Sequence, residues 1–382
     1  MKLCLKAKYV SEDPAVRLRY CRQLEFGATQ ESAKSLPAAV ARGWPTADEV
    51  RALKAPFADA GIEVVALEPV KEPQRAWVED TAAGRASFDA FARHLDAAGA
   101  AGIPSVTLHP PLDGARDAAE AAAHLEQNVA FYARAARRAR DAGTRLATHS
   151  PYASPFRADG RRHLTKPLWG EQAFGELFAA VPAPENGLIY CFGCMHMADG
   201  DGLHQMARFI DRTFFVHVRD VVEYPDGSFD EVFPGQGTVD PEAAIRALWA
   251  LGYRGPITPE HNPVVHGESY SGPVATAYSA GWCNAILKGL AAAASSSLRN
   301  SRIHSQPSRA PRAVTIRPST TTGAATYVAP QTSASKRHLG TQVTRLPAIT
   351  PAVASTSMPW QTEPTGRPRA TWLRTAASRA AS

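Results

Sequence analysis

Short β-rich runs alternate with longer helical segments through the first 290 residues. The eight runs are 3–7, 24–30, 62–69, 104–110, 145–151, 187–193, 213–220 and 255–261. The segments between most of them are rich in Ala, Arg, Glu and Leu, and one of them ends at Gly143, a residue type favoured after a helix C-terminus. Eight strand and helix units predict an α/β fold, a (β/α)8 TIM barrel. An open doubly wound sheet would need a GxGxxG loop after an early strand, and the sequence has none there.

Polar side chains of metal-binding types stand at the ends of six predicted strands. In chain order they are Glu68, His109, His149, Cys191, His217 and the pair Glu260 and His261. Because the C-terminal ends of barrel strands meet at one rim, we expect these side chains to converge there. One such histidine alone would more often be a hydrogen-bonded structural residue. Imidazole, thiolate and carboxylate groups together suit a divalent transition metal such as Mn, Fe, Co or Zn.

Three motifs lie at the ends of predicted strands, namely NGLIYC at 186–191, FFVHVRDV at 214–221 and TPEHNP at 258–263. They resemble motifs of the mannonate dehydratase family, in the xylose isomerase-like TIM barrel superfamily. NGLIYC is similar to the family's NGL-x-x-C motif, FFVHVRDV is similar to a strand motif that carries a ligand histidine, and TPEHNP stands where the family has Pro-Asp-His. The segment 36–73, with its Trp-Pro helix start, resembles the family as well, so the similarity extends over about residues 1–290.

The resemblance implies a metal-dependent hydro-lyase that converts D-mannonate to 2-keto-3-deoxy-D-gluconate in glucuronate catabolism. The metal ligands that it implies are His149, Cys191, His217 and Glu260, around Mn²⁺ or Fe²⁺. It also implies His261 as a catalytic acid or base. For the second acid or base we take Tyr278, with Tyr270 and His109 as other candidates. From their positions at the rim, Arg219, His109 and Glu68 are predicted to bind the substrate.

The sequence also departs from the family pattern. HSPYASPF at 149–156 replaces an acidic, proline-rich stretch, and Glu260 stands where the family has aspartate. Glutamate at that position is more usual in the epimerases and isomerases of the superfamily, and PGQGTVD at 234–240 fits these enzymes too. The alternative function is therefore a metal-dependent sugar epimerase or isomerase. A third alternative is a barrel that binds a ligand without catalysis.

The composition changes abruptly after residue 290. Residues 291–382 are rich in Ala, Ser, Thr, Arg and Pro. Their 12 basic residues and one acid (Glu363) give this segment a net charge of +11, whereas the whole chain has a net charge of +6. The first 290 residues therefore carry −5. We predict a catalytic barrel domain over 1–290 and a disordered tail over 291–382, because the tail has too little apolar surface to fold.

Composition also bears on the setting and the partners. The five cysteines are scattered and no secretory leader precedes them, which favours a reducing cytoplasmic location over a disulfide scaffold. No apolar run approaches the roughly 20 residues that cross a bilayer. The tail lacks the aromatic interleaving of nucleic-acid binders. We expect a small-molecule sugar acid as partner, no specific nucleic acid and no membrane, and a homo-oligomer is compatible with this class.

Overall fold

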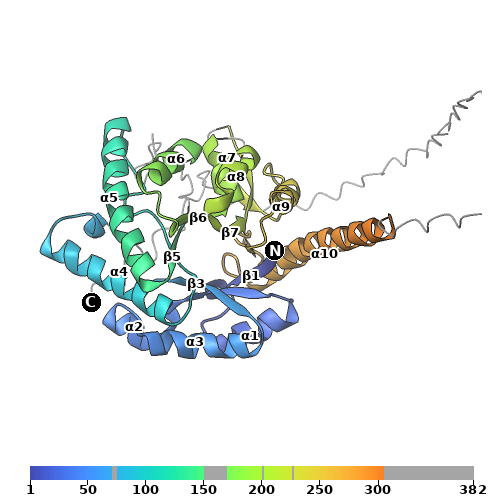
Figure 1. Cartoon of the computed structure of the whole chain (residues 1–382), viewed down its shortest axis with the longest axis horizontal. Coiled ribbons are helices and arrows are strands. Elements are labelled where there is room, and N and C mark those ends of the chain that lie inside the picture. Colours follow the sequence, from blue (N-terminus) through green and yellow to red (C-terminus); the bar gives the residue numbers. More distant parts are fainter. Residues whose placement is uncertain (71–74, 150–169, 200–201, 226–227, 305–382) are drawn as a thin grey trace, which may run out of the picture. The chain divides into compact units, whose positions relative to one another are not determined.

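Eight parallel strands close into a barrel in the computed structural model of this chain (Figure 1). The structure describes residues 1–70, 75–149, 170–199, 202–225 and 228–304. The barrel strands are β1 (Lys2–Lys6), β2 (Ala28–Ser32), β3 (Glu63–Glu68), β4 (Ser105–Leu108), β5 (Arg145–His149), β6 (Asn186–Cys191), β7 (Thr213–Val218) and β10 (Pro256–Pro259). They pair in the order β1-β10-β7-β6-β5-β4-β3-β2. The predicted (β/α)8 barrel is confirmed, and each strand overlaps its predicted run.

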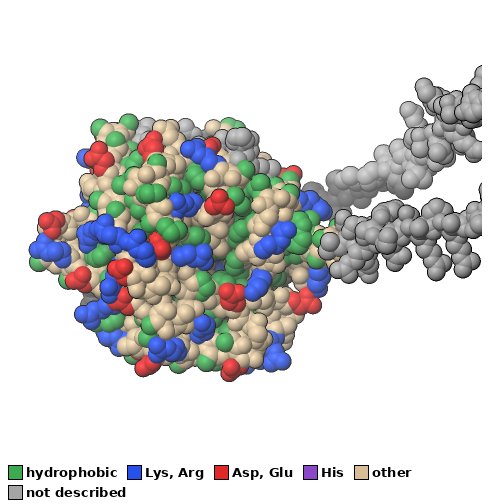
Figure 2. All heavy atoms as spheres, in the orientation of Figure 1, with side chains coloured by type: hydrophobic (Ala, Val, Ile, Leu, Met, Phe, Trp, Pro, Cys, Tyr) green, Lys and Arg blue, Asp and Glu red, His purple; other side chains and the backbone are tan. Residues whose placement is uncertain are grey.

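Helices surround the strands, as Figure 1 shows. They are α1 (Pro14–Gln23), α2 (Pro37–Arg42), α3 (Ala47–Asp59), α4 (Ala82–Ala100), α5 (Ala118–Ala142), α6 (Gly170–Ala180), α7 (Phe192–Asp199), α8 (Gly202–Arg208), α9 (Pro241–Ala250) and α10 (Pro273–His304). Short 3-10 turns are η1 (Ala7–Tyr9), η2 (Ala33–Ser35), η3 (Arg75–Trp77) and η4 (Ile210–Arg212). Side chains of both charges are interspersed over the face drawn in Figure 2.

Local sequence signals explain where the helices begin and end. α3 starts with a capping box, in which Thr46 accepts a hydrogen bond from the Glu49 backbone and Glu49 accepts one from the Thr46 backbone. α5 ends at Gly143, as predicted, with a φ of 76° that suits glycine. In α3 the spacing of Val50, Leu53 and Phe57 places all three on the buried face.

The barrel has two apolar regions. The larger one lies between the strands and the helices, and the smaller one fills the barrel interior. The interior set is Cys4, Ala28, Val65, Ala66, Ala147, Ile189 and Phe215. The small residues among them leave room for polar side chains inside the barrel toward the C-terminal ends of the strands. Packing therefore closes the bottom of the barrel and leaves the top for chemistry.

A two-stranded antiparallel hairpin follows β7 and was not predicted. It consists of β8 (Asp220–Glu223) and β9 (Phe229–Val232) and is separate from the barrel sheet. Its residues do not show the clear alternation of apolar and polar side chains that marks a half-buried strand. The hairpin extends the rim on the side of β7, and its turn includes residues 226–227, outside the described residues.

The last helix crosses the predicted domain boundary at residue 290. α10 continues to His304, and the compact unit that contains the barrel spans Met1–Arg309. Beyond Leu290, residues 291–293 are exposed. The division into 1–290 and 291–382 stays a prediction, because residues 305–382 lie outside the described residues. No helix among the described residues is long and apolar enough to span a membrane.

A buried ion pair links α1 to the barrel. Arg17 Nη2 lies 2.5 Å from Glu31 Oε2, and their side chains are 2% and 0% exposed. Arg17 also donates to the carbonyl oxygens of Ser11 and Glu12, at 3.0 and 2.7 Å, and Glu31 accepts from Thr29 Oγ1 at 2.9 Å. Each charge thus has several partners, which offset the cost of removing it from water.

We predict that Arg17→Met lowers the free energy of unfolding by about 3 kcal/mol or more, because it leaves the Glu31 charge buried and unpaired. Chemical denaturation measures this. Lys288→Met is the control, since it breaks an exposed pair with Glu25 and should leave the unfolding midpoint unchanged. The double variant Arg17→Met with Glu31→Leu should recover much of the loss. A change of less than about 0.5 kcal/mol for Arg17→Met would contradict the prediction.

Candidate metal centre

Four adjacent barrel strands bring the predicted ligands together. His149 ends β5, Cys191 ends β6, His217 lies one residue before the end of β7, and Glu260 follows β10. The four strands are consecutive in the barrel, and Cys191 and His217 are direct partners in the pairing of β6 with β7. Four side chains that are far apart in the sequence therefore point to one region of the rim.

The ligand atoms of His149, Cys191, His217 and His261 all lie within 4.8 Å of one another. His149 Nε2 is 3.0 Å from His217 Nδ1. Metal bonds of about 2.0 to 2.3 Å place ligand atoms about 3 to 4.6 Å apart around one ion. This group contains three of the four predicted ligands. Its fourth member is His261, which we predicted as an acid or base.

Glu260 lies at the edge of this group and is almost fully buried. Its Oε2 is 2.5 Å from His217 Nδ1 and 3.2 Å from His261 Nε2. Its Oε1 accepts a hydrogen bond from Lys6 and one from Tyr9 at 3.3 Å. One carboxylate oxygen is thus held by β1 and η1, and the other faces the histidines.

The backbone turns at His261, and the Asn262-Pro263 pair that follows is of a type common in turns. His261 has a left-handed φ of 63°, which is unusual for a residue other than glycine and carries strain. Two hydrogen bonds at Asn262 stabilise the turn. The Asn262 backbone N–H donates to Ser271 Oγ at 2.8 Å, and Ser279 Oγ donates to Asn262 Oδ1 at 2.6 Å. Adjacent residues of a regular strand would point to opposite faces. This turn lets both Glu260 and His261 reach the cavity.

The residues fit a bound cation. His261 Nε2 is buried and makes no hydrogen bond within the described part of the chain, and it faces the carboxylate oxygen Glu260 Oε2 at 3.2 Å. Two buried acceptor atoms directed at one point are costly unless a proton or a cation lies between them. The donor set of imidazole nitrogen, thiolate sulfur and carboxylate oxygen suits a divalent transition ion rather than magnesium.

Burial and neighbouring charges set the protonation states. Burial lowers the pKa of His149 to about 4 and that of His261 well below its usual value, so both rings are neutral near pH 7. Burial also raises the pKa of the Cys191 thiol to about 11. Burial opposes the ionisation of Glu260 as well, but His217, His261 and Lys6 hold the pKa of its carboxyl well below the usual value. Of these four groups, only the thiol must lose a proton to bind an ion.

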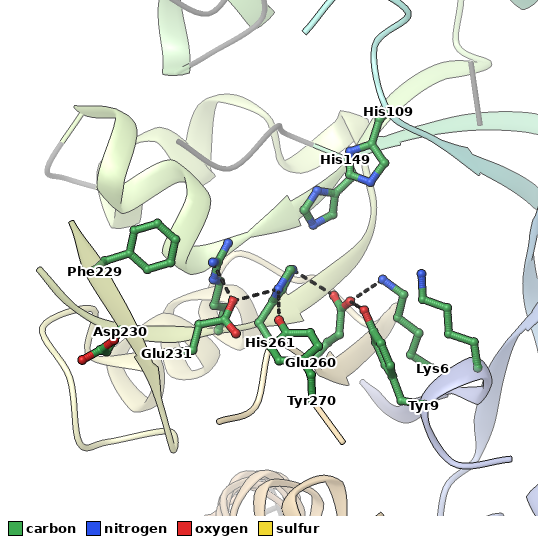
Figure 3. A pocket seen from close by; sticks show the side chains of 12 residues that line it. Lys6, Tyr9, His109, His149, Phe229, Asp230, Glu231, Glu260, His261 and Tyr270 are labelled. Carbon is green, nitrogen blue, oxygen red and sulfur yellow. Dashed lines mark hydrogen bonds and ion pairs between the residues drawn. The ribbon is translucent and has the colours of Figure 1, made fainter. Parts of the chain in front are cut away.

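The site opens into a cavity of about 490 Å³ (Figure 3). Cationic side chains on its wall are Lys6, Lys8 and Arg219, and anionic ones are Asp230, Glu231 and Glu260. Tyr9 and Tyr270 stand edge to face on the same side, with their ring centroids 5.7 Å apart. The cavity is therefore polar and charged.

The residues predicted to bind substrate occupy different positions. Arg219 and His109 both line the cavity, although Arg219 is only 1% exposed and the ring of His109 packs 5.0 Å from that of His149. Burial, with a smaller effect of Lys6, lowers the pKa of His109 to about 4. Glu68 is not among the lining residues. It is buried beside Lys8 and Lys34, at 3.3 and 3.2 Å, and so positions Lys8.

Tyr278, which we predicted as catalytic, does not line the cavity. It is 53% exposed on α10, and its ring packs on Phe233 with centroids 4.4 Å apart. Tyr270 lies in the cavity instead, with its hydroxyl 2.7 Å from His261 Nδ1 (Figure 3). The count of residues after the last strand could not separate the two tyrosines, since the intervening loop has no regular periodicity.

Sequence reasoning missed several residues of the cavity. Lys6 stands at the end of β1, a position that barrel geometry marks as part of the rim. Lys8 and Tyr9 follow it in η1. Glu231 comes from the hairpin, and because the hairpin was not predicted, no signal in the sequence pointed to this residue.

We predict that each ion bound displaces about one proton, which comes from Cys191. Below the thiol pKa of about 11 the sulfur is protonated, so metal affinity should rise about tenfold for each pH unit. Titration calorimetry in buffers of different ionisation enthalpy counts the protons. Cys191→Ser should bind more weakly and release about one proton fewer, whereas Cys283→Ser, on α10, should match the unchanged chain. Equal proton release by Cys191→Ser and the unchanged chain would exclude Cys191 as a ligand.

Known proteins share this fold and, over parts of the chain, its sequence. A mannonate dehydratase from Brucella canis is 30% identical over 183 residues, which are 44% of this chain and 45% of that protein. The chain matches less than half the length of the first curated relatives. The crystal structure of mannonate dehydratase from Streptococcus suis serotype 2 superposes with a TM-score of 0.62 at 18% identity, over 77% of this chain and 96% of that one.

A second solved structure contains a metal. The IOLI protein with a bound zinc atom superposes with a TM-score of 0.52 at 16% identity, over 68% of this chain and 88% of that chain. At these identities the structures establish the fold alone. The sequence pattern of the xylose isomerase-like TIM barrel family matches residues 18–284. Since this match covers most of the chain, the protein belongs to the xylose isomerase-like TIM barrel family.

Proposed function

We propose that this protein is a metal-dependent dehydratase of a sugar acid, converting D-mannonate to 2-keto-3-deoxy-D-gluconate with Mn²⁺ or Fe²⁺. The observation that carries the proposal is the convergence of His149, Cys191, His217 and Glu260 beside a polar cavity. The partial similarity to mannonate dehydratases supports the choice of substrate. We place the enzyme in the cytoplasm, with a small sugar acid as its partner.

The charges of the cavity suit an anionic substrate. Its three cationic and three anionic side chains balance, and a divalent ion bound beside them adds positive charge. Lys8 is the most exposed of the three cationic side chains, at 36% against 12% for Lys6 and 1% for Arg219, and its ammonium group pairs with Glu68. We assign Lys8 to the substrate carboxylate, because an ammonium on a flexible stem can follow an entering anion.

The chemistry requires two proton transfers. A divalent ion held by the four ligands would act as a Lewis acid toward the substrate carboxylate and the C2 hydroxyl, and so favour loss of the C2 proton. A base takes that proton, and the C3 hydroxyl receives a proton and leaves as water. His261 is neutral and reaches the cavity, so it can serve in one transfer.

Tyr270 is our choice for the second transfer, in place of Tyr278. Its hydroxyl is directed into the cavity and contacts His261 Nδ1 at 2.7 Å. Burial, together with Glu231 and Glu260, raises the pKa of this tyrosine above its usual value, so it enters the reaction protonated. A protonated phenol can supply the proton that the departing hydroxyl needs.

A sugar epimerase or isomerase is the second candidate, and Glu260 is the observation that favours it. Glutamate at this strand end is the residue type more usual in the epimerases of the superfamily. Their reaction would begin in the same way, with removal of a proton from the carbon beside a metal-bound oxygen. Incubation of the metal-loaded protein with a panel of aldonic acids and ketoses separates the two. Our proposal requires 2-keto-3-deoxy acids as products, and epimers would establish the second candidate.

We predict that His261→Asn lowers turnover by about 10²-fold or more, the usual scale for loss of a general acid or base. Glu260→Gln should lose both metal and activity, because it removes a charge from the ligand group. Steady-state kinetics together with metal content measure both effects. Glu223→Gln, at the end of β8 in the hairpin, serves as the control and should keep normal turnover. Near-full activity of His261→Asn would assign the histidine a structural role.

A further inference from the structure

Two lysines share one buried carboxylate at the edge of the cavity. Lys8, in η1 after β1, and Lys34, in η2 after β2, both lie beside Glu68 at the end of β3. Their Nζ atoms are 3.3 and 3.2 Å from the same oxygen, Glu68 Oε1. Since both distances end on one atom, the two ammonium nitrogens lie at most 6.5 Å apart, the total of 3.3 and 3.2 Å. Three neighbouring strands thus bring two cations together at the rim.

The carboxylate is buried, whereas both lysine side chains reach solvent. The side chain of Glu68 is 5% exposed, against 36% for Lys8 and 47% for Lys34. Burial opposes the ionisation of Glu68, but Lys8, Lys6 and Lys34 hold the pKa of its carboxyl below the usual value. One oxygen accepts one N–H from each lysine, and an ammonium group has three. Both lysines therefore keep N–H groups for a further acceptor.

Glu68 does not neutralise this side of the cavity. Lys6, the third lysine there, pairs with Glu260. The Nζ atoms of Lys6 and Lys8 lie 5.6 and 5.2 Å from the centroid of the Tyr9 ring, which lines the cavity. The three lysines face two carboxylates, which leaves an excess of one positive charge on this side.

The opposite side of the cavity has the reverse balance. Figure 3 shows the hairpin residues Asp230 and Glu231 on the side away from Lys6. Arg219 pairs with Glu231 at 2.6 Å, so this one cation faces two carboxylates. A ligand with a single anionic end is therefore expected to direct that end toward the lysines and its neutral end toward the hairpin.

We propose that Lys8 and Lys34 together bind the carboxylate of the ligand, and that this lysine pair makes the site selective for acids over neutral sugars. The inference rests on the proposed function for the identity of the acid, and it adds Lys34, which is not among the residues that line the cavity. Charge-assisted hydrogen bonds are about 2.8 Å long, so one carboxylate can bridge two ammonium groups at this separation. Its oxygens have about four acceptor sites, which leaves others for the metal.

Calorimetric titration of the zinc-loaded full chain with glycolate tests the proposal. Glycolate has the carboxylate and the adjacent hydroxyl of an aldonic acid, and glycolamide is its neutral counterpart. Because Lys34→Met removes one of two partly exposed cations, we expect it to lower the affinity for glycolate about fivefold. Its affinity for glycolamide should not change. Lys34→Arg keeps the charge and should stay within about twofold of the unchanged chain.

Lys2→Met is the control for net charge. Lys2 pairs with Glu63 at 2.7 Å, where β1 and β3 begin, at the end of the barrel opposite to the rim. Lys2→Met thus removes the same charge far from the cavity and should keep the affinity for glycolate. Thermal melting shows that each variant is folded.

Equal glycolate affinity of Lys34→Met and the unchanged chain, including no binding by either, would overturn the proposal. An equal loss in Lys2→Met or in Lys34→Arg would overturn it as well. Because the lysines are not metal ligands, the same ratio between variants is expected when the titrations are repeated without zinc. No turnover is measured, so this failure is distinct from a failure of the dehydratase assay.

Discussion

Closure of eight parallel strands is the constraint on which the site depends. Because every strand runs in the same direction, all the C-terminal ends lie at one rim, and the order β10-β7-β6-β5 makes four ligand-bearing ends neighbours. The small interior residues at the base of the barrel, such as Ala28 and Ala147, leave the upper interior to polar side chains.

Charge pairing then organises the rim. Lys6 and Tyr9 hold one oxygen of Glu260, and Arg219 holds Glu231. His261 lies between the two carboxylates, 3.2 Å from each. These contacts come from β1, η1, the β7 end, the hairpin and the loop after β10, so elements distant in the sequence meet around one imidazole ring.

Much of this could be predicted from the sequence. The alternation of strands and helices fixes the barrel, and the strand ends place His149, Cys191 and His217 in one group. The positions of Tyr270 and Tyr278 could not be separated, because a loop without periodicity joins them to β10. The hairpin and Glu231 escaped prediction since short, polar strands give a weak pattern, and the contacts of Lys8 with Glu68 depend on tertiary packing. The assignment of ligands and catalytic residues stays a proposal.

X-ray absorption spectroscopy of the full chain, loaded with zinc as a probe, is the sharpest test of the proposed metal centre. The method reports the type and distance of the atoms around the ion. We predict one sulfur at about 2.3 Å with nitrogen and oxygen ligands at about 2.0 to 2.2 Å, and loss of the sulfur contribution in Cys191→Ser. A shell of nitrogen and oxygen alone in the unchanged chain would contradict the proposed metal centre.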